Sequence, residues 1–472
     1  MRGSISGVDL TGAFRSWQTG RNERYDEAIG DRFESSLRVS GRQYIVNQNG
    51  DVREMRGLLA KRQRTADFIN DERFVTQSQY DTFAGETTLP GGRRAYEIQV
   101  APPGGQPEQV YIDEKTSMID RIAYVANDGI STEDYFDYKT FAGALVAQRE
   151  VDSNGDHAYD VTHVTHDILV DKPIDPAVFQ LPPSTVVETD KPVTVQLQEQ
   201  DGHYYTEVRI HDHPYRFLVD TGAQGIVLDS HVADAEHLRP EGRLEVSGAQ
   251  RIGGLGFASL ADIQIGRATL PVRLVSVLDL RGATGRFSAD GILGYPFFAA
   301  AEVKIDARAG TMTFGQPGSL NAPGTATPID VDRELIELQG KVNDVEGRFV
   351  VDTGNSTELL LFEPFMRAHP NLLEGEDRHF ASNFGVGGSV RAVAAYVDEL
   401  DFGDVRFFNR YASLMLSDQG AFADRFDAGN IGMAVLKNLV VTFDVANAKL
   451  YLERGSNFDD GRYRSRTEQV MP

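Results

Sequence analysis

Two stretches decide the fold of this chain: Phe217-Leu218-Val219-Asp220-Thr221-Gly222 and Phe349-Val350-Val351-Asp352-Thr353-Gly354. Each is an apolar run that ends in Asp-Thr-Gly, and the second lies 132 positions after the first. Apolar runs of this kind are typical of buried strands, so each carboxylate is expected at the end of a rigid element. The recurrence predicts two copies of one structural unit, each of which supplies a carboxylate.

The duplication favours a catalytic pair over two unrelated turns. A single Asp-Thr-Gly would indicate a turn, because all three residue types favour turns. Two carboxylates held close together cannot both ionise, so one can act as an acid while the other acts as a base toward water. Thr221 and Thr353 are stiff, hydroxyl-bearing residues suited to a hydrogen-bonded loop, and Gly222 and Gly354 permit close backbone approach.

The repeat can be followed downstream of both aspartates. Counting 32 positions from each leads to a glycine-rich segment, at Ile252 and at Phe384. These segments predict two glycine-rich hairpin tips, which include Ile252, Gly253, Gly254, Gly385, Gly387 and Gly388. Each copy then ends in an Ile/Leu-Gly element and a pair of strands, predicted at 302–306 with 311–314 and at 439–444 with 449–453. A repeat of this length is the size of a small β domain.

This order of motifs resembles the aspartic proteases, and the glycine-rich tips resemble the retropepsin-like branch in particular. The resemblance covers roughly residues 195 to 454. It implies a bilobal fold in which Asp220 and Asp352 flank one water and glycine-rich flaps close over an extended peptide. It also implies an aspartic endopeptidase that needs neither metal nor organic cofactor, acts on a peptide or protein, and works as a monomer with an intramolecular pseudo-dimer site.

The second copy departs from the family pattern. Asn430 stands where the first copy carries Ile292, and the residues after the two triplets are Ala223 and Asn355. Pepsin-like members usually carry a hydroxyl at the latter position. Losing those donors is expected to leave the pKa values of the aspartates higher, and Asn430 mildly favours a chain that has lost activity.

Residues 1–185 lie outside the repeat. A polar opening through Trp17 and Tyr25 is expected to be helical, and short alternating strands follow it. The order of these strands resembles the outer-membrane lipoprotein carrier and lipoprotein-sorting proteins, which implies an antiparallel half-barrel with a helix, in the envelope of a Gram-negative bacterium. A generic β domain is the alternative. Met1–Ser4 look like an appended tag, so a signal peptide is expected to be missing from this sequence.

The predicted fold is therefore all-β. Its predicted parts are an N-terminal β domain (1–185), a first protease lobe (193–316), a second lobe (328–454) and a polar tail (455–472). Proline- and glycine-rich segments at 182–192 and 315–328 are the expected linkers.

Composition excludes several classes of function. The 472 residues carry a net charge of −23, which argues against nucleic acid as a partner. The chain has no cysteine, which excludes disulfides and thiolate sites, and it has no apolar run long enough to span a membrane. A periplasmic or secreted location is expected, with a cytoplasmic one as the alternative.

No metal site is predicted. His211-Asp212-His213-Pro214 is interpreted as a hairpin turn, because the second copy has Asn343-Asp344 at the same place. His163 and His166 should point to opposite faces of a strand. The segment Asp152–Asp156 lacks the glycine and glutamate positions of a calcium loop.

Two rival functions remain open from the sequence. The repeat could be a peptide-binding module without activity. Alternatively, the N-terminal domain could hold a lipid or lipoprotein, with the protease-like repeat as an accessory.

Overall fold

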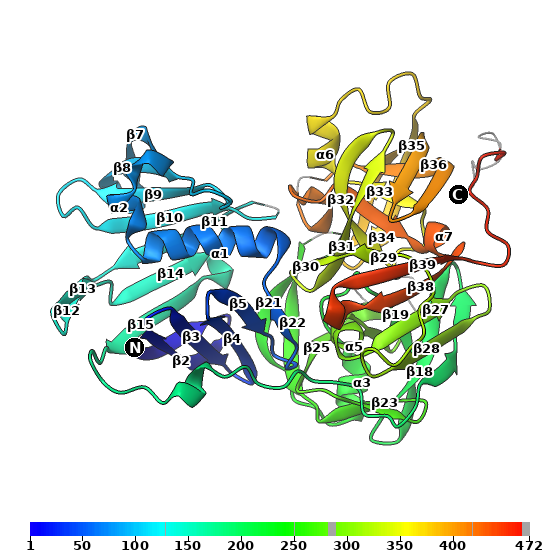
Figure 1. Cartoon of the computed structure of the whole chain (residues 1–472), viewed down its shortest axis with the longest axis horizontal. Coiled ribbons are helices and arrows are strands. Elements are labelled where there is room, and N and C mark those ends of the chain that lie inside the picture. Colours follow the sequence, from blue (N-terminus) through cyan, green and yellow to red (C-terminus); the bar gives the residue numbers. More distant parts are fainter. Residues whose placement is uncertain (128, 250, 282–288, 418, 465–472) are drawn as a thin grey trace. The chain divides into compact units, whose positions relative to one another are not determined.

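The computed structural model describes residues 1–127, 129–249, 251–281, 289–417 and 419–464, and it is mostly β (Figure 1). The described residues form two compact units. Unit 1 comprises Met1–Gln48, Val52–Pro183 and Glu241–Leu244, and unit 2 comprises Asn49–Asp51, Ser184–Pro240 and Glu245–Pro472. None of the helices in the described part of the chain is long and apolar enough to cross a membrane.

Unit 1 is built on one antiparallel sheet with the strand order β6-β5-β4-β3-β2-β1-β15-β14-β11-β10-β9-β8-β7. The strands of this sheet are β1 (Arg2–Gly7), β2 (Leu10–Thr19), β3 (Asn22–Ile29), β4 (Arg32–Val39), β5 (Arg42–Val46), β6 (Val52–Glu54), β7 (Asp81–Leu89), β8 (Arg93–Val100), β9 (Glu108–Asp113), β10 (Ile119–Val125), β11 (Ile130–Phe136), β14 (Arg149–Ser153) and β15 (Val161–Asp167). A small separate hairpin pairs β12 (Lys139–Phe141) with β13 (Ala144–Val146).

The helical opening expected for the first residues is wrong. Trp17 lies in β2 and Tyr25 in β3, two strands joined by the two-residue turn Gly20-Arg21. Gly20 has φ 56°, and Gly30 has φ 55° in the next turn, a conformation that glycine adopts without strain. The residues expected to be an appended tag also belong to the fold, because Arg2–Gly7 pair with both β2 and β15.

A helix packs on this sheet, as expected for the N-terminal domain. In Figure 1, α1 (Gly57–Asn70) lies across the strands, followed by the short α2 (Arg73–Thr76). Phe68 and Ile69 of α1 are buried against Val100, Val110 and Ile122 of the sheet. This cluster is the apolar core of unit 1.

Unit 2 contains two lobes and a sheet made from both. The first lobe holds β17 (Gln198–Gln200), β18 (His203–Ile210), β19 (His213–Val219), β20 (Val227–Asp229), the end of β21 (Glu241–Ser247, of which Glu241–Leu244 belong to unit 1), β22 (Arg251–Ser259), β23 (Asp262–Ile265), β24 (Ala268–Pro271), β25 (Leu274–Leu278) and β26 (Gly291–Leu293). The second lobe holds β30 (Asp330–Asp332), β31 (Leu335–Val342), β32 (Val345–Asp352), β33 (Leu359–Leu361), β34 (His379–Gly385), β35 (Gly388–Phe402), β36 (Val405–Met415) and β37 (Gly429–Gly432). The short helices are α3 (Ser230–Ala235), α5 (Tyr295–Ala300), α6 (Glu363–Ala368) and α7 (Met433–Leu436).

The joint sheet confirms the predicted strand pairs at the end of each copy. Its order is β16-β28-β27-β38-β39-β29, formed by β16 (Val193–Gln196), β27 (Glu302–Asp306), β28 (Thr311–Gly315), β29 (Ala326–Pro328), β38 (Leu439–Asp444) and β39 (Lys449–Arg454). Beneath it, Phe314, Phe297, Phe298 and Phe443 form a chain of edge-to-face rings. This core joins the two lobes into one body, which is what a site shared between them requires.

The repeat is visible in the strands that lead to the two aspartates. In the first lobe, β18 and β19 are joined by the turn His211-Asp212, and in the second, β31 and β32 are joined by Asn343-Asp344. All four turn residues have positive φ, between 45° and 71°. The turn interpretation of the histidine segment is therefore confirmed.

Residues 455–464 of the predicted polar tail are among the described residues. Phe458 packs against the core of unit 2, and Arg464 forms an ion pair with Glu358, so residues up to 464 are held against the second lobe. Residues 465–472 lie outside the described residues.

Candidate active site

The two aspartates stand at equivalent ends of two central strands. Asp220 directly follows β19, which runs parallel to β26, and Asp352 ends β32, which runs parallel to β37. The backbone N–H of Gly222 donates to Asp220 Oδ1 at 2.8 Å, and that of Gly354 donates to Asp352 Oδ1 at 2.9 Å. Each loop thus holds its own carboxylate in the same way.

The loops are tied to each other by reciprocal hydrogen bonds of their threonines. The N–H of Thr221 donates to Thr353 Oγ1, and the N–H of Thr353 donates to Thr221 Oγ1, both at 3.0 Å. Thr221 Oγ1 donates to the carbonyl of Val351 at 2.6 Å, and Thr353 Oγ1 donates to that of Val219 at 2.9 Å. Both threonines are buried, so these bonds fix the position of one lobe on the other without competition from water.

The glycines of the two triplets let each carboxylate approach the opposite loop. A Cβ on Gly222 would lie 2.5 to 2.6 Å from the carboxylate of Asp352. A Cβ on Gly354 would lie 2.2 to 2.4 Å from the carboxylate of Asp220. Carbon and oxygen atoms cannot approach so closely without a shift, so only glycine fits at either position.

Burial and mutual repulsion make the pair unequal in charge. Burial, followed by the nearby charge of Asp352, raises the pKa of Asp220 well above its ordinary value. Asp220 therefore holds a proton at pH values where an exposed aspartate has lost it. A carboxyl group and a carboxylate side by side can act as acid and base at once.

A chain of amide hydrogen bonds supports Asp352 and has no counterpart around Asp220 among the described residues. Asn430 Nδ2 donates to Asp352 Oδ2, Asn355 Nδ2 donates to Asn430 Oδ1 at 2.8 Å, and the N–H of Asn355 donates to Asp352 Oδ1 at 3.1 Å. The sequence suggested that Asn430 marks a degraded element. In the structure its amide is in direct contact with one of the two aspartates.

Two hairpins meet over the pair, and the predicted position of the first tip is wrong. Its turn follows Ser247, the last residue of β21, so Gly248 and Ala249 lie at the tip while Gly253 and Gly254 lie in the returning strand β22. Ile252 also lies in β22, and its side chain is outside the described residues. Counting 32 positions fails because Ile252 follows its turn whereas Phe384 precedes the turn of the second hairpin.

The second tip is where the sequence places it. Gly385 pairs with Gly388 across the turn Val386-Gly387. The N–H of Ala249 donates to the carbonyl of Val386 at 2.7 Å, so the two tips touch. Both tips and both aspartates line one cleft of about 1990 Å³. This exceeds the usual volume of a pocket for a small ligand and suits an extended chain.

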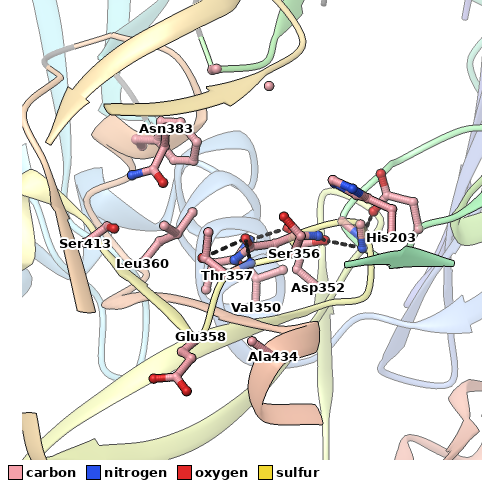
Figure 2. A pocket seen from close by; sticks show the side chains of 18 of the residues that line it. His203, Val350, Asp352, Ser356, Thr357, Glu358, Leu360, Asn383, Ser413 and Ala434 are labelled. Carbon is pink, nitrogen blue, oxygen red and sulfur yellow. Dashed lines mark hydrogen bonds between the residues drawn. The ribbon is translucent and has the colours of Figure 1, made fainter. Parts of the chain in front are cut away.

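The walls of the cleft differ between the lobes. The wall beside Asp220 is apolar, with Leu218, Leu280 and Ile292 in one buried cluster. The wall beside Asp352 carries polar groups, among which Figure 2 shows His203, Ser356 and Thr357 near Asp352, and Asn383 and Ser413 farther along. His203 and Gly248 are site residues that counting along the repeat did not reveal.

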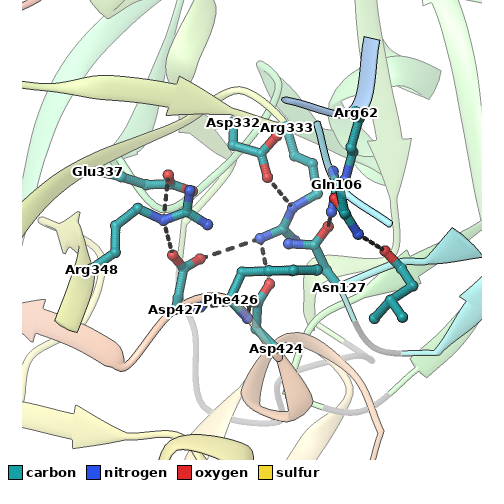
Figure 3. A network of polar contacts seen from close by, with 11 residues as sticks. Arg62, Gln106, Asn127, Asp332, Arg333, Glu337, Arg348, Asp424, Phe426 and Asp427 are labelled. Carbon is teal, nitrogen blue, oxygen red and sulfur yellow. Dashed lines mark hydrogen bonds and ion pairs between the residues drawn. The ribbon is translucent and has the colours of Figure 1, made fainter. Parts of the chain in front are cut away.

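A network of ion pairs (Figure 3) contributes Arg333, Asp424 and Asp427 to the lining of the cleft. Arg333 pairs with Asp424 at 2.6 Å, and Arg348 pairs with Asp427 at 2.6 Å and with Glu337 at 3.0 Å. Burial, followed by repulsion from Asp427, raises the pKa of Glu337 to about 10. Glu337 is therefore protonated at neutral pH, and Asp427 carries the charge that faces Arg348.

In unit 1, Asp152 and His163, which were assessed separately as possible metal ligands, lie close to each other and to Glu150. Glu150, Asp152 and His163 each offer a ligand atom, and these atoms lie within 4.8 Å of one another. Glu150 and His163 are opposite each other on β14 and β15, which places their side chains on one face of the sheet. His166 donates to or accepts from Ser4 instead.

Comparison with known proteins supports the protease-like region. A family described as aspartyl protease matches residues 206–297, which include Asp220 and end before the second copy. No curated protein matches the chain. Among solved structures, the chain is similar to a DUF1329 family protein from Desulfovibrio piger, with 12% identity over 38% of this chain and 87% of that chain and a TM-score of 0.28. Values this low identify neither a shared fold nor a shared function.

Proposed function

We propose that this chain is an aspartic endopeptidase with one active site, formed by Asp220 and Asp352. The observation that supports it best is the pair of matching loops, in which each carboxylate is held by its own loop and lies against the glycine of the other. The aspartyl protease match over residues 206–297 supports the same reaction class.

The proposed reaction is the attack of a water on a peptide carbonyl. The ionised carboxylate takes one proton from the water as its oxygen bonds to the carbonyl carbon. The protonated carboxyl gives its proton to the carbonyl oxygen, which forms a neutral tetrahedral diol. When the C–N bond breaks, the leaving nitrogen takes a proton from the carboxyl that received it. One hydroxyl of the diol returns its proton to the other carboxylate, which leaves the carboxylic acid product and restores the singly protonated pair.

The substrate of this reaction is a peptide or protein segment in extended form. The cleft has room for it, and the contacting tips around Gly248 and Gly387 form a roof over the aspartates. The apolar wall of Leu218, Leu280 and Ile292 favours an apolar side chain on the Asp220 side. A monomer suffices for this chemistry, because one chain supplies both carboxylates. A periplasmic or secreted location rests on the resemblance of the N-terminal segment to lipoprotein carriers.

The test is cleavage of a diverse peptide mixture by the full chain, read by mass spectrometry with and without a statine-type inhibitor. We expect new peptide ends that disappear with the inhibitor. The full chain with Asp352→Asn is the matched control and should produce none. If the wild-type chain binds peptides from the mixture but leaves them intact over the whole range from pH 3 to pH 8, the inactive binding module is the better account.

A further inference from the structure

The two lobes match closely up to the aspartates and then differ at several positions beside them. Residue pairs 132 positions apart are equivalent through this segment, and Ile292 and Asn430 take the same place in the parallel strands β26 and β37. Three of the differing pairs, first lobe then second, are Ala223 and Asn355, Gly225 and Thr357, and Ile292 and Asn430. At each, the first lobe carries an apolar residue and the second a hydrogen-bonding one.

The three polar residues form one directed chain that ends on Asp352. The backbone N–H of Thr357 donates to Asn355 Oδ1 at 2.9 Å, and the Thr357 hydroxyl also donates to it at 2.8 Å. Asn355 Nδ2 donates in turn to Asn430 Oδ1, and Asn430 Nδ2 donates to Asp352 Oδ2.

The direction of this chain is fixed by a group that can only donate. A backbone N–H has no acceptor capacity, so the atom of Asn355 that faces Thr357 N must be the oxygen. The nitrogen of Asn355 then faces Asn430, whose oxygen must accept it. This leaves the nitrogen of Asn430 for Asp352, so the amide orientation follows from the hydrogen-bond network.

Asp352 therefore receives three donors: the N–H groups of Gly354 and Asn355 at Oδ1, and the Asn430 amide at Oδ2. In the first lobe, Asp220 accepts from the backbone N–H groups of Gly222 and Gly354, while Ala223 and Ile292 have no side-chain donor to offer. Asn430 is itself buried, with 7% of its surface exposed, so water does not compete for this bond. Donors to a carboxylate stabilise its charged form.

We infer that Asn430, held by Asn355 and Thr357, makes the pair unequal, so that Asp352 carries the charge and acts as the general base while Asp220 keeps the proton and donates it to the carbonyl oxygen. This inference rests on the proposed function. Asn430 is a positioning residue in it, because it acts through Asp352. The raised pKa of Asp220 agrees with this division of roles.

A pH profile must be protected from the titration of the other ionisable groups near the two aspartates. His203 faces Asp352 from β18, with Asp201 and Glu199 nearby, and burial lowers its pKa below the ordinary value. Of the charged residues of the second lobe that line the cleft, Glu358 pairs with Arg410 and Arg464, and Arg333 pairs with Asp424, while His379 and Lys437 also line it. A pH test therefore has to separate Asp352 from His203.

The test compares the pH dependence of kcat/KM for the wild-type chain and for Asn430→Ile, which copies the first lobe. Loss of one charge-assisted donor should move the acidic limb upward by about one pH unit or more, while the upper limb, set by Asp220, stays in place. Asn355→Ala should move the same limb in the same direction. Asn447→Ala, which removes an amide bonded to Asp444 away from the cleft, should move neither. The shift should persist in a His203→Gln background.

The outcomes separate the inference from the proposed function. If the wild-type chain cleaves peptides but both Asn430→Ile and Asn355→Ala keep the wild-type acidic limb, or move only the upper limb, the assignment is wrong and the protease proposal stands. If the wild-type chain does not cleave, carboxyl ¹³C NMR of the Asp-labelled chain decides, with Asp352→Asn identifying the resonance. The inference then requires Asp352 to ionise at lower pH than Asp220 and to lose this advantage in Asn430→Ile.

Discussion

The threonine pair offers a quantitative test of how the two lobes are held together. Thr221→Val keeps the shape of the side chain but removes the hydroxyl that accepts from Thr353 N and donates to the Val351 carbonyl. Thr221 is fully buried, so the Thr353 N–H is left without this partner and water cannot replace it. One unsatisfied buried donor together with one lost bond should cost roughly 2 to 4 kcal/mol of local stability.

Native-state hydrogen exchange measures this cost directly. Because the chain has two compact units, a global melting curve would mix them, whereas exchange reports on chosen segments. A loss of 2 to 4 kcal/mol corresponds to roughly 30- to 900-fold faster exchange of amides in residues 349–355. Thr221→Ser is the matched control, since it keeps the hydroxyl and removes one methyl group, at about 1 kcal/mol. Equal exchange in the two variants, or wild-type exchange in Thr221→Val, would refute the reasoning.

Three further predictions concern the loops, the tips and the buried ion network. Gly354→Ala should abolish peptide cleavage while the chain stays folded, because its Cβ would lie 2.2 to 2.4 Å from the Asp220 carboxylate; retained kcat would contradict this. Gly248→Ala should raise KM more than it lowers kcat, because the new Cβ would lie 2.4 Å from the Val386 carbonyl oxygen and force the tips apart. Steady-state kinetics tests this, and an unchanged KM would show that the tips do not cover the substrate. Glu337→Gln should stabilise unit 2 at pH 8 but not at pH 4. The pKa of Glu337 is about 10 in the folded chain and 4.5 ordinarily, so the wild-type side chain contributes its full stability below pH 4.5 and loses that stability as the pH rises toward 10. Urea unfolding of both proteins at the two pH values tests this, and an equal difference at both would count against it.

The sequence was sufficient to predict the strands and turns that the two copies share. The apolar runs before Asp220 and Asp352 became matching strands because both follow the same two-residue turn and enter the same parallel pairing. The strand pairs that close each copy were likewise predictable from alternation and spacing. These features depend on residues that are close together in the sequence, so one sequence is enough to predict them.

Counting failed where the two copies differ in length. The first tip begins at Gly248, 248 − 220 = 28 positions after Asp220, whereas the turn of the second hairpin begins at Val386, 386 − 352 = 34 positions after Asp352. An offset measured from the aspartates therefore cannot reach equivalent points in both hairpins. The agreement at 32 positions was a coincidence of glycine content, and the tip at Gly248 could have been found only from the strand pairing.

The role of Asn430 could not be read from the sequence because it depends on a long-range contact. Asn430 lies 78 positions after Asp352 and reaches it only because β37 pairs in parallel with β32. Considered alone, Asn430 departs from the family pattern and therefore favoured a chain that has lost activity. In the folded chain it is the last donor in a hydrogen-bond chain that begins at Thr357 and ends on Asp352.

The central claim is that one chain builds one site from two different lobes, and mixing two inactive variants tests it most directly. Asp220→Asn and Asp352→Asn should each lower kcat/KM for a peptide by roughly 100- to 10,000-fold, because each removes one partner in proton transfer. An equimolar mixture of the two folded variants should stay as inactive as either alone, since every chain still lacks one carboxylate. Near wild-type turnover in either variant, or recovery of activity on mixing, would contradict the account.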